Sequence, residues 1–265
     1  GEDGKDAIDK FVLIGDHKQL PAVVQQNTEQ SAIYDESLLS IGLTNLKDSL
    51  FERLYRNCTA TVHRSYDMLC RQGRMHPEVA LFANRAFYGG RLIPVGLPHQ
   101  IESSDTICRL AFYPSVPEKV GASAKINYSE ARIVADLAVR IYEDHQADFD
   151  ESRTLGIITP YRSQIALIKK EIESLGIPAL NRILVDTVER FQGSERDVII
   201  YSFCVNYPYQ LKFLSNLTEE EGVLIDRKLN VALTRARKQM FITGVPELLE
   251  RNPLYKSLLK LIESF

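Results

Sequence analysis

The second half of this chain alternates between strand-length apolar runs and segments with helical apolar spacing, and this alternation limits the fold more than any other feature. Strands that alternate with helices along a chain pair in parallel, and the connecting helices cover both faces of the sheet. The pattern therefore predicts an α/β fold with a mostly parallel sheet and helices on both faces. Strands are predicted over Thr154–Thr159, Arg182–Thr187, Asp197–Phe203 and Gln239–Gly244.

Helical segments separate these strands. Ser129 is expected to cap one helix, because a serine oxygen accepts from the unpaired amides at a helix start. Ile133, Leu137 and Ile141 then follow at the helical period. Further helices are predicted from Pro160 to Gly176, over Asp226–Arg237, and as a terminal helix from Asn252-Pro253.

The first half of the chain is less regular. Four apolar residues before Gly15 predict a strand over Phe11–Gly15. Helices are predicted over Ser49–Arg56 and His76–Leu92. The stretch Pro94–Asn127 is predicted to be a loop-rich connection that contains one strand, Thr106–Tyr113.

Composition excludes several classes of protein. No apolar run approaches the roughly 20 residues that span a bilayer, and the polar, acidic first ten residues contain no visible signal peptide. The four cysteines form no Cys-x-x-Cys pair, which favours reduced thiols in a cytoplasmic protein over zinc ligands or disulfides. The net charge is -3, so a nucleic-acid partner requires a local basic groove.

Polar clusters follow the predicted strands directly, and carboxyl ends of parallel strands are where α/β proteins keep their chemistry. Asp16–Gln19 follows the first strand, and Gly193 permits a tight turn within another cluster. Arg235 and Arg237 supply guanidinium groups, which suit a phosphate-rich ligand. On the predicted helix these two arginines point about 200° apart, so at most one of them faces a given site.

Five segments in fixed order resemble motifs III to VI of superfamily 1 helicases: "GDHKQLP", "RQGRMHP", "ITPYRSQ", "VDTVERFQGSERDVII" and "LNVALTRAR". The match is closest to the up-frameshift and immunoglobulin-mu-binding-protein branch of superfamily 1B, which "SLFERL" and "FYGGRL" also resemble. The resemblance covers Phe11 to Gly244. It implies a motor of two RecA-like lobes with ATP in their cleft, where residues 1–66 are a remnant of the first lobe and residues 67–265 are the second.

The resemblance also implies roles at the nucleotide. Gln19 corresponds to the motif III glutamine that senses the γ-phosphate, with Asp16 holding its turn. Arg74 corresponds to the motif IV arginine that reaches the γ-phosphate, and Arg235 to the motif VI arginine finger. Two arginines suit the charge that spreads over the transferred phosphoryl group during hydrolysis. Gly193 and Glu195 fall in the motif V nucleotide segment, where the carboxylate accepts from the ribose.

A second group falls where the family contacts single-stranded nucleic acid. Hydroxyl, amide and guanidinium groups at strand ends can hold phosphates without reading sequence. These residues are Thr159, Tyr161, Arg162, Gln164, Thr187 and Gln192.

Each role has a structural alternative on local grounds. Asp16 can simply stabilise its own turn, and Gln19 can be an ordinary surface amide. Arg74 and Arg235 can be ion-pair residues, and Tyr161 is a core aromatic or a stacking platform. The histidines His17 and His76 are interpreted as hydrogen-bonding turn residues rather than catalysts, and no metal cluster is predicted around either.

The sequence also departs from the family pattern. The phosphate cradle Gly-x-x-x-x-Gly-Lys-Ser/Thr is missing, and Gly4-Lys5 is followed by Asp6. The acidic pair that holds Mg²⁺ is missing before Phe11, so ATP and Mg²⁺ are expected to need the absent part of the first lobe, and the chain alone should not hydrolyse ATP. Gly73 stands where the family commonly has a tyrosine beside the nucleotide. This glycine favours the alternative of a non-catalytic nucleic-acid-binding or scaffold module.

Overall fold

The computed structural model describes residues 10–21, 24–27, 29–60, 65–103, 107–118, 123–220 and 222–265. The chain divides into two compact units, Gly1–Met68 and Leu69–Phe265. Each unit is described separately below. The Gly4-Lys5-Asp6 segment lies outside the described residues.

The N-terminal unit contains helices α1 (Glu36–Ser40) and α2 (Leu50–Ala60). The helix predicted over Ser49–Arg56 is confirmed by α2, which continues one turn further. Asp35 caps α1 by accepting from the backbone amides of Ser37 and Leu38. On α2, Arg56 pairs with Glu52 at 2.6 Å.

The strand predicted over Phe11–Gly15 is wrong. These residues are assigned to no strand, and Phe11, Val12 and Ile14 are 67%, 87% and 88% exposed. A β-strand exists only when a neighbour pairs with its amides and carbonyls, and no described residue of this unit does so. The apolar run therefore records a strand-forming sequence without the partner that would order it.

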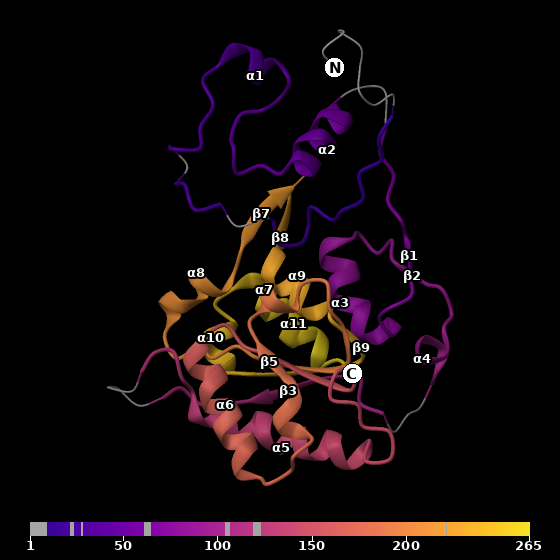
Figure 1. The fold of residues 1–265 in the computed structure, drawn as a ribbon, viewed down its shortest axis with the longest axis vertical. Coiled ribbons are helices and arrows are strands. Elements are labelled where there is room, and N and C mark those ends of the chain that lie inside the picture. The colour runs from indigo at the N-terminus through magenta and orange to yellow at the C-terminus, as the bar shows by residue number, and fades with distance from the viewer. Residues whose placement is uncertain are drawn as a thin grey trace. The chain divides into compact units, whose positions relative to one another are not determined.

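The C-terminal unit is built on a five-stranded parallel sheet in the order β3-β9-β6-β4-β5 (Figure 1). The longest pairing joins β6 to β9, from Arg196 opposite Ala236 to Ser202 opposite Thr243. This confirms the predicted parallel sheet. The strands are β3 (Leu110–Pro114), β4 (Leu155–Ile158), β5 (Leu184–Asp186), β6 (Arg196–Ser202) and β9 (Ala236–Gly244).

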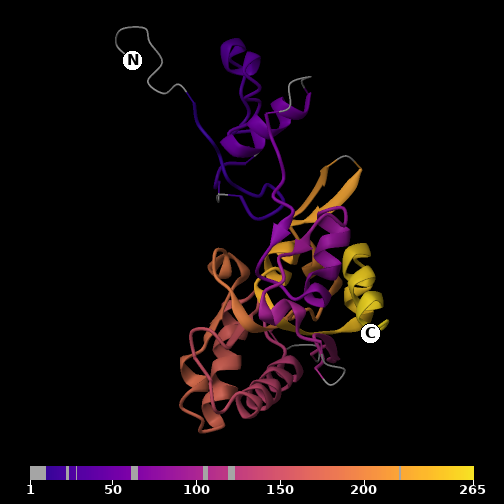
Figure 2. The same ribbon diagram turned by 90° about the vertical axis from the view of Figure 1, so that its right-hand side faces the viewer.

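Both faces of the sheet are covered, because successive side chains of a strand point to opposite faces. On β6, Val198 and Ile200 belong to the apolar core formed with α5 (Tyr128–Asp144) and α6 (Arg162–Ser174). Tyr201 instead contacts Phe203, which contacts Tyr255 of α11 (Pro253–Ile262), in tilted ring pairs with centroids 4.4 and 5.0 Å apart. Figure 2 shows α5 and α6 together on one side of the sheet and α11 on the other.

Shorter elements complete this unit. Helix α3 (Pro77–Phe87) packs against α9 (Arg227–Leu233) and β9. The two-residue strands β1 (Arg71–Gln72) and β2 (Ile93–Pro94) pair in parallel. The remaining short helices are α4 (Pro98–Ile101), η1 (Leu180–Arg182), α7 (Val188–Phe191), η2 (Pro208–Gln210), α8 (Leu211–Leu214) and α10 (Pro246–Leu249).

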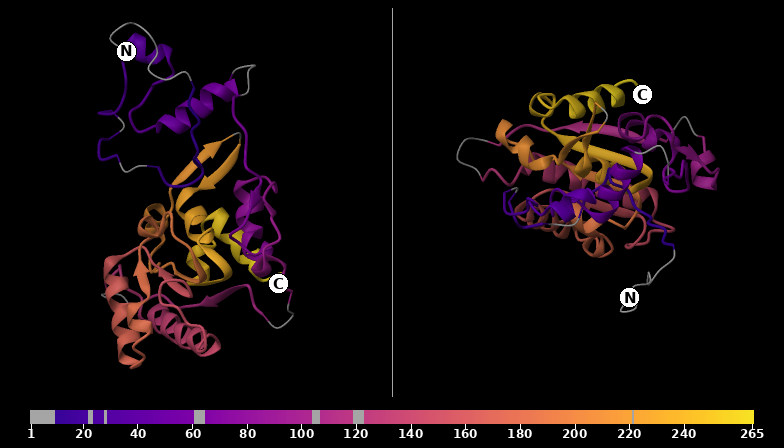
Figure 3. Two further views of the ribbon diagram at one scale, coloured as in Figure 1. Left: turned by 45° about the vertical axis from the view of Figure 1, so that its right-hand side comes forward. Right: turned by 90° about the horizontal axis from the view of Figure 1, so that it is seen from above.

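An antiparallel hairpin of β7 (Leu217–Glu220) and β8 (Val223–Asp226) extends away from the sheet (Figure 3). Asp226 closes its base. The carboxylate accepts from the amides of Asn216, Lys228 and Leu229 at 3.0 to 3.2 Å, and from the Tyr255 hydroxyl at 2.9 Å. One buried side chain therefore joins the hairpin, the start of α9 and helix α11.

Three predicted helix boundaries are corrected. Asn127, rather than Ser129, caps α5, because its side chain accepts from the Glu130 amide. Helix α6 begins at Arg162 because Tyr161 is extended, so Pro160 lies before the helix. The helix predicted over Asp226–Arg237 ends at Leu233, since Ala236 already pairs with β6.

The buried carboxyl of Glu130 ties α5 to the ends of two strands. Its Oε2 accepts from the Ser202 hydroxyl at 2.7 Å and from the Cys204 amide at 2.8 Å, while Ser115 donates to Oε1 at 3.4 Å. Cys204 has a φ of 50°, in the left-handed region. Burial raises the pKa of Glu130 to about 7, against the opposing effect of these hydrogen bonds. The carboxyl thus fixes the chain where it leaves β6.

We expect Glu130→Gln to flatten the dependence of the free energy of unfolding on pH. The wild-type carboxyl stays protonated in the folded chain up to about pH 7, whereas the unfolded chain loses that proton near the ordinary value of 4.5. Wild-type stability therefore falls as the pH rises between these values, by up to about 3 kcal/mol. Urea unfolding at about pH 5 and about pH 7.5 measures this loss. Equal losses in both proteins would contradict the role of the buried carboxyl.

Candidate functional site

The predicted site residues of the C-terminal unit lie at opposite edges of the sheet. Thr159 follows β4 and Thr187 follows β5, at the carboxyl edge. Glu195 precedes β6 and Arg235 precedes β9, at the amino edge. Because β4, β5, β6 and β9 run parallel, Thr159 and Thr187 lie at the opposite edge from Glu195 and Arg235. Gln192 lies in the turn that leads to Glu195.

The amino edge brings Arg74 and Glu195 together. Arg74 Nε donates to Glu195 Oε2 at 2.6 Å, and Arg74 Nη1 donates to the Thr234 carbonyl at 3.1 Å. The Arg74 side chain is 32% exposed and that of Glu195 is 45% exposed. The guanidinium is therefore held in place while part of it stays open to a ligand.

Arg235 lies next to this pair but is buried. Its Nε donates to the Val231 carbonyl at 3.0 Å, Nη1 to the Ser194 carbonyl at 3.2 Å, and Nη2 to the Thr234 hydroxyl at 3.0 Å. These bonds join the end of α9 to the turn before β6. The Arg235 guanidinium thereby holds the loop that contains Thr234, whose carbonyl accepts from Arg74.

Arg237 is a site neighbour that sequence reasoning missed. The helical argument placed it away from Arg235, but Arg237 lies in β9. Its Nη1 contacts Asp197 at 2.8 Å, and its Nε lies 3.6 Å from Glu195 Oε1. Glu195 therefore lies between Arg74 and Arg237. Arg237 could have been placed beside Glu195 from the sequence only if the end of the helix at Leu233 had been recognised.

Asp16 and Gln19 form a turn within the N-terminal unit. Asp16 Oδ1 accepts from the Lys18 amide at 3.0 Å, and Oδ2 accepts from Gln19 Nε2 at 2.9 Å. The neighbouring His17 stacks on Tyr55 with centroids 4.2 Å apart. Asp16 thus holds its own turn, and it orients the Gln19 side chain. Convergence of Gln19 with the arginines of the other unit stays a prediction.

At the carboxyl edge, Thr159, Tyr161 and Arg162 follow one another out of β4. The Thr159 amide donates to the Asp186 carbonyl at 3.1 Å, and its buried hydroxyl has no hydrogen-bond partner among the described residues. Half-buried Tyr161 accepts from Gln210 Nε2 at 3.1 Å. Burial raises the pKa of Tyr161, with smaller contributions from neighbours that include Tyr209. Arg162 is exposed at the first position of α6.

The other predicted contacts differ in their access to solvent. Gln164 is buried and binds the Asn127 backbone at both ends of its amide, at 2.8 and 3.0 Å. It therefore fastens α6 to the start of α5. Half-buried Thr187 begins α7, and exposed Gln192 ends it beside Gly193, whose φ of 83° explains the glycine.

A network of amides behind Tyr161 was not predicted. Asn127 Nδ2 donates to Asn206 Oδ1 at 2.9 Å, and Asn206 Nδ2 donates to the Ile126 carbonyl at 2.7 Å. Gln210 accepts from the Asn206 amide at 2.9 Å. These residues come from segments far apart in the chain, so no local sequence pattern marks them.

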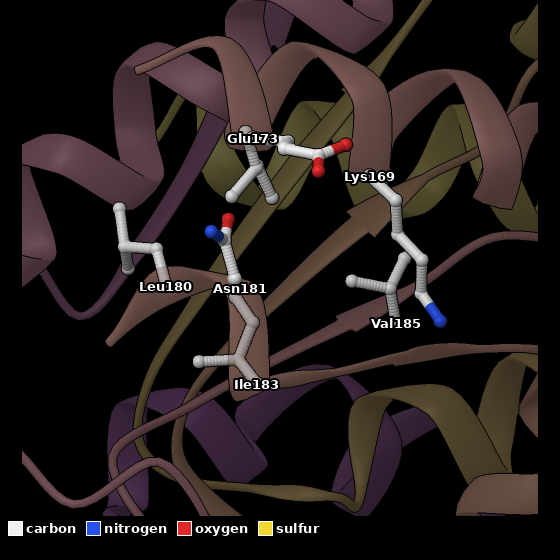
Figure 4. Close-up of a pocket in the computed structure, with 7 residues that line it drawn as sticks. Lys169, Glu173, Leu180, Asn181, Ile183 and Val185 are labelled. Carbon is white, nitrogen blue, oxygen red and sulfur yellow. The ribbon is translucent and has the colours of Figure 1, made fainter. Parts of the chain in front are cut away.

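A separate hollow of about 220 Å³ lies between α6 and the β5 edge (Figure 4). Lys169 and Glu173 reach it from α6, and Ile183 and Val185 line its other side. It contains none of the predicted site residues, so we do not include it in the candidate site.

Over the parts of the chain that the structure describes, no three His, Cys, Asp or Glu side chains are grouped to hold a metal ion. Within those same parts, no helix is both long and apolar enough to cross a membrane.

The five-stranded parallel sheet with helices on both faces is an α/β fold of the RecA-like type. The chain belongs to the AAA domain family, whose model matches residues 46–247, more than half of the chain. The family match and the helicase relatives agree with the superfamily 1 helicase motifs of the sequence.

Several curated proteins are similar to this chain. A probable helicase of Dictyostelium discoideum is 31% identical over 95% of this chain and 24% of its own length. The probable helicase MAGATAMA 3 of Arabidopsis thaliana is 30% identical over 95% of this chain and 29% of its own length. The DNA replication ATP-dependent helicase/nuclease DNA2 of Xenopus laevis is 30% identical over 92% of this chain and 23% of its own length. The chain thus spans less than a third of these relatives.

The relatives do not single out the up-frameshift branch that the motifs favoured, which stays a prediction. A solved C-terminal domain of a possible DNA helicase from a Lactobacillus is 14% identical, with a TM-score of 0.37, over 66% of this chain and 88% of that one. A likeness this weak carries no argument.

We expect alanine at the two arginines to affect stability very differently. Arg74→Ala removes a partly exposed ion pair and should lower the free energy of unfolding by less than about 1 kcal/mol. Arg235→Ala leaves buried acceptors without a donor and should lower it by about 3 kcal/mol. Urea denaturation of both variants measures the difference, and similar losses would contradict the contrast in burial.

Proposed function

We propose that this chain works as the C-terminal motor lobe of an ATP-dependent helicase. The observation that carries the proposal is the group at the amino edge, where Glu195 fixes a partly exposed Arg74 beside the loop of Arg235. The proposed single-strand contacts Thr159, Tyr161 and Arg162 lie at the other edge of the same sheet. One lobe would therefore meet the nucleotide and the track on separate surfaces.

Arg74 would meet the γ-phosphate of ATP. Bound ATP would supply the phosphoryl group that is transferred. A guanidinium already held by a carboxylate needs little reorganisation to stabilise the negative charge that develops on that group. Arg235 keeps the proposed role of arginine finger, and its bonds to Val231 and Ser194 keep the loop in shape. Glu195 retains lone pairs for a ribose hydroxyl beside its two arginines.

The magnesium ion does not fit the described residues, because they contain no grouped metal ligands. We propose that Mg²⁺ is bound by the first RecA-like lobe, whose phosphate cradle is also missing from the sequence. The chain by itself would then not hydrolyse ATP. The exposed apolar run Phe11–Ile14 supports this proposal, because further strands of the first lobe would cover it.

The track would be a single nucleic-acid strand. Thr159, Tyr161 and Arg162 leave β4 together, and Thr187 and Gln192 follow the neighbouring strand β5. Such groups bind the phosphate backbone without reading bases. The four cysteines form no Cys-x-x-Cys pair, a spacing that favours reduced thiols, and we propose the cytoplasm.

The scaffold alternative rests on Gly73. A Cβ placed there would lie 3.3 Å from Leu97 Cδ1 and 3.5 Å from Val95 Cγ2, so apolar side chains already pack against this backbone. A tyrosine ring beside the nucleotide is missing from the sequence. A full-length protein that binds single strands but has no ATPase activity would favour this alternative.

We expect nucleic-acid-stimulated ATPase activity in the full-length protein, and loss of about two orders of magnitude or more in Arg74→Ala. Arg74 is the sharper probe because its removal costs the fold little. Arg85→Ala, an exposed arginine on α3, is the matched control and should retain full turnover. Near-normal turnover in Arg74→Ala would refute its contact with the γ-phosphate.

Arg235→Ala should also reduce turnover by orders of magnitude. Since this change also destabilises the loop, Arg235→Lys is the companion variant, which keeps the charge but loses the planar fork. The ATPase rate is compared with the melting temperature of each variant. A fully active Arg235→Lys protein would contradict the finger role.

A further inference from the structure

Three aromatic side chains follow β6: the half-buried Tyr207 and the exposed Tyr209 and Phe213. Tyr207 and Tyr209 stack with centroids 5.8 Å apart and ring planes inclined by 14°. Tyr209 nevertheless remains 55% exposed, and Phe213 is 68% exposed. Tyr209 lies in η2 and Phe213 in α8, the helix that follows it directly. We call Tyr207, Tyr209 and Phe213 the aromatic row.

The backbone beneath the row is firmly held. Gln210 is buried, and its side-chain oxygen accepts from the amides of Asn206 and Tyr207, both at 2.9 Å. Its Nε2 donates to the Ala124 carbonyl at 2.7 Å. Leu211 and Leu214 anchor α8 in the core. The rings are thus presented to solvent by a fixed support, which limits the entropy that binding would cost.

The row continues the edge where the single-strand contacts are proposed. Strands β4 and β6 are neighbours, and Ile158 lies opposite Tyr201 near their carboxyl ends. Gln210 Nε2 also donates to the Tyr161 hydroxyl at 3.1 Å, which joins the two segments directly. A strand held at Tyr161 and Arg162 therefore lies beside the row.

The charges near the row come from several segments. Lys228 Nζ donates to the Phe213 carbonyl at 3.4 Å and pairs with Glu189 at 3.2 Å, and the backbone amide of Glu118 donates to Asn206 Oδ1 at 3.1 Å. Residues 203–215 contain no carboxylate, and their single charged side chain is the exposed Lys212, between Tyr209 and Phe213. The exposed Arg162 adds a second cation next to Tyr161. Aromatic faces beside cations are the combination that binds single strands without sequence preference.

We propose that the aromatic row is a base-stacking platform that extends the nucleic-acid track beyond the β4 edge. Bases of a single strand stack on Tyr209 and Phe213, while Arg162 and Lys212 meet the backbone. This inference rests on the proposed function, because it requires a strand at Tyr161. It adds residues that lie outside the helicase motifs.

The test measures binding of fluorescent oligo(dT) and oligo(U) by the full-length protein. Tyr209→Leu and Phe213→Leu keep apolar bulk but remove the π-face, and each should weaken binding by about fivefold to a hundredfold. Tyr209→Phe should restore wild-type affinity. The matched control is Tyr34→Leu, the same change at an exposed tyrosine of the N-terminal unit. Unchanged melting temperatures confirm that each variant folds.

Salt dependence separates stacking from charge. The leucine variants should retain the wild-type slope of log affinity against log salt, whereas Arg162→Ala should lower that slope by about 0.7. Wild-type affinity in both leucine variants would overturn the platform and leave the proposed function standing, which is the result expected if the row binds a protein partner. A wild-type protein that binds neither oligonucleotide would instead refute the proposed function.

Discussion

The pairing of β6 with β9 is the interaction on which the rest of the structure depends. Its register sets Arg196 opposite Ala236, so the turns before both strands, with Glu195 and Arg235, meet at one edge. At the other end it sets Ser202 opposite Thr243, and the chain leaves β6 above the Glu130 carboxyl. A slip of one residue would turn every side chain of β6 to the wrong face and separate both groups at once.

The two edges hold their functional side chains in different ways. At the amino edge, a carboxylate holds the guanidinium of Arg74 and carbonyls hold that of Arg235. The charge of Arg74 is thereby fixed in position and stays partly exposed to solvent. At the carboxyl edge, neutral amides from distant segments interlock through Asn127, Asn206 and Gln210. Neutral amides avoid the cost of buried charge and still fix their neighbours in direction. This network supports Tyr161 and the backbone of the aromatic row.

The sequence was sufficient for the parallel sheet, because apolar period and strand length are local properties. It was insufficient at Phe11–Gly15, where strand formation depends on a partner that no local pattern reveals. It also failed at Arg237, because pairing of Ala236 with β6 ends the helical pattern early. The family motifs brought out Arg74 and Glu195, which the structure joins, but not the burial of Arg235 and Gln164. Burial is set by packing across the whole fold.

Asp226 has a consequence for how chains of this kind vary. The bonds of its carboxylate are made at the base of the β7–β8 hairpin, to Asn216, to the start of α9 and to Tyr255. Strand residues farther out, such as Glu219 and Leu224, pair across the hairpin. The hairpin can therefore lengthen or shorten in evolution without changing the loop that contains Arg235. The bonds of Asp226 at the base of the hairpin do not depend on how far its strands extend.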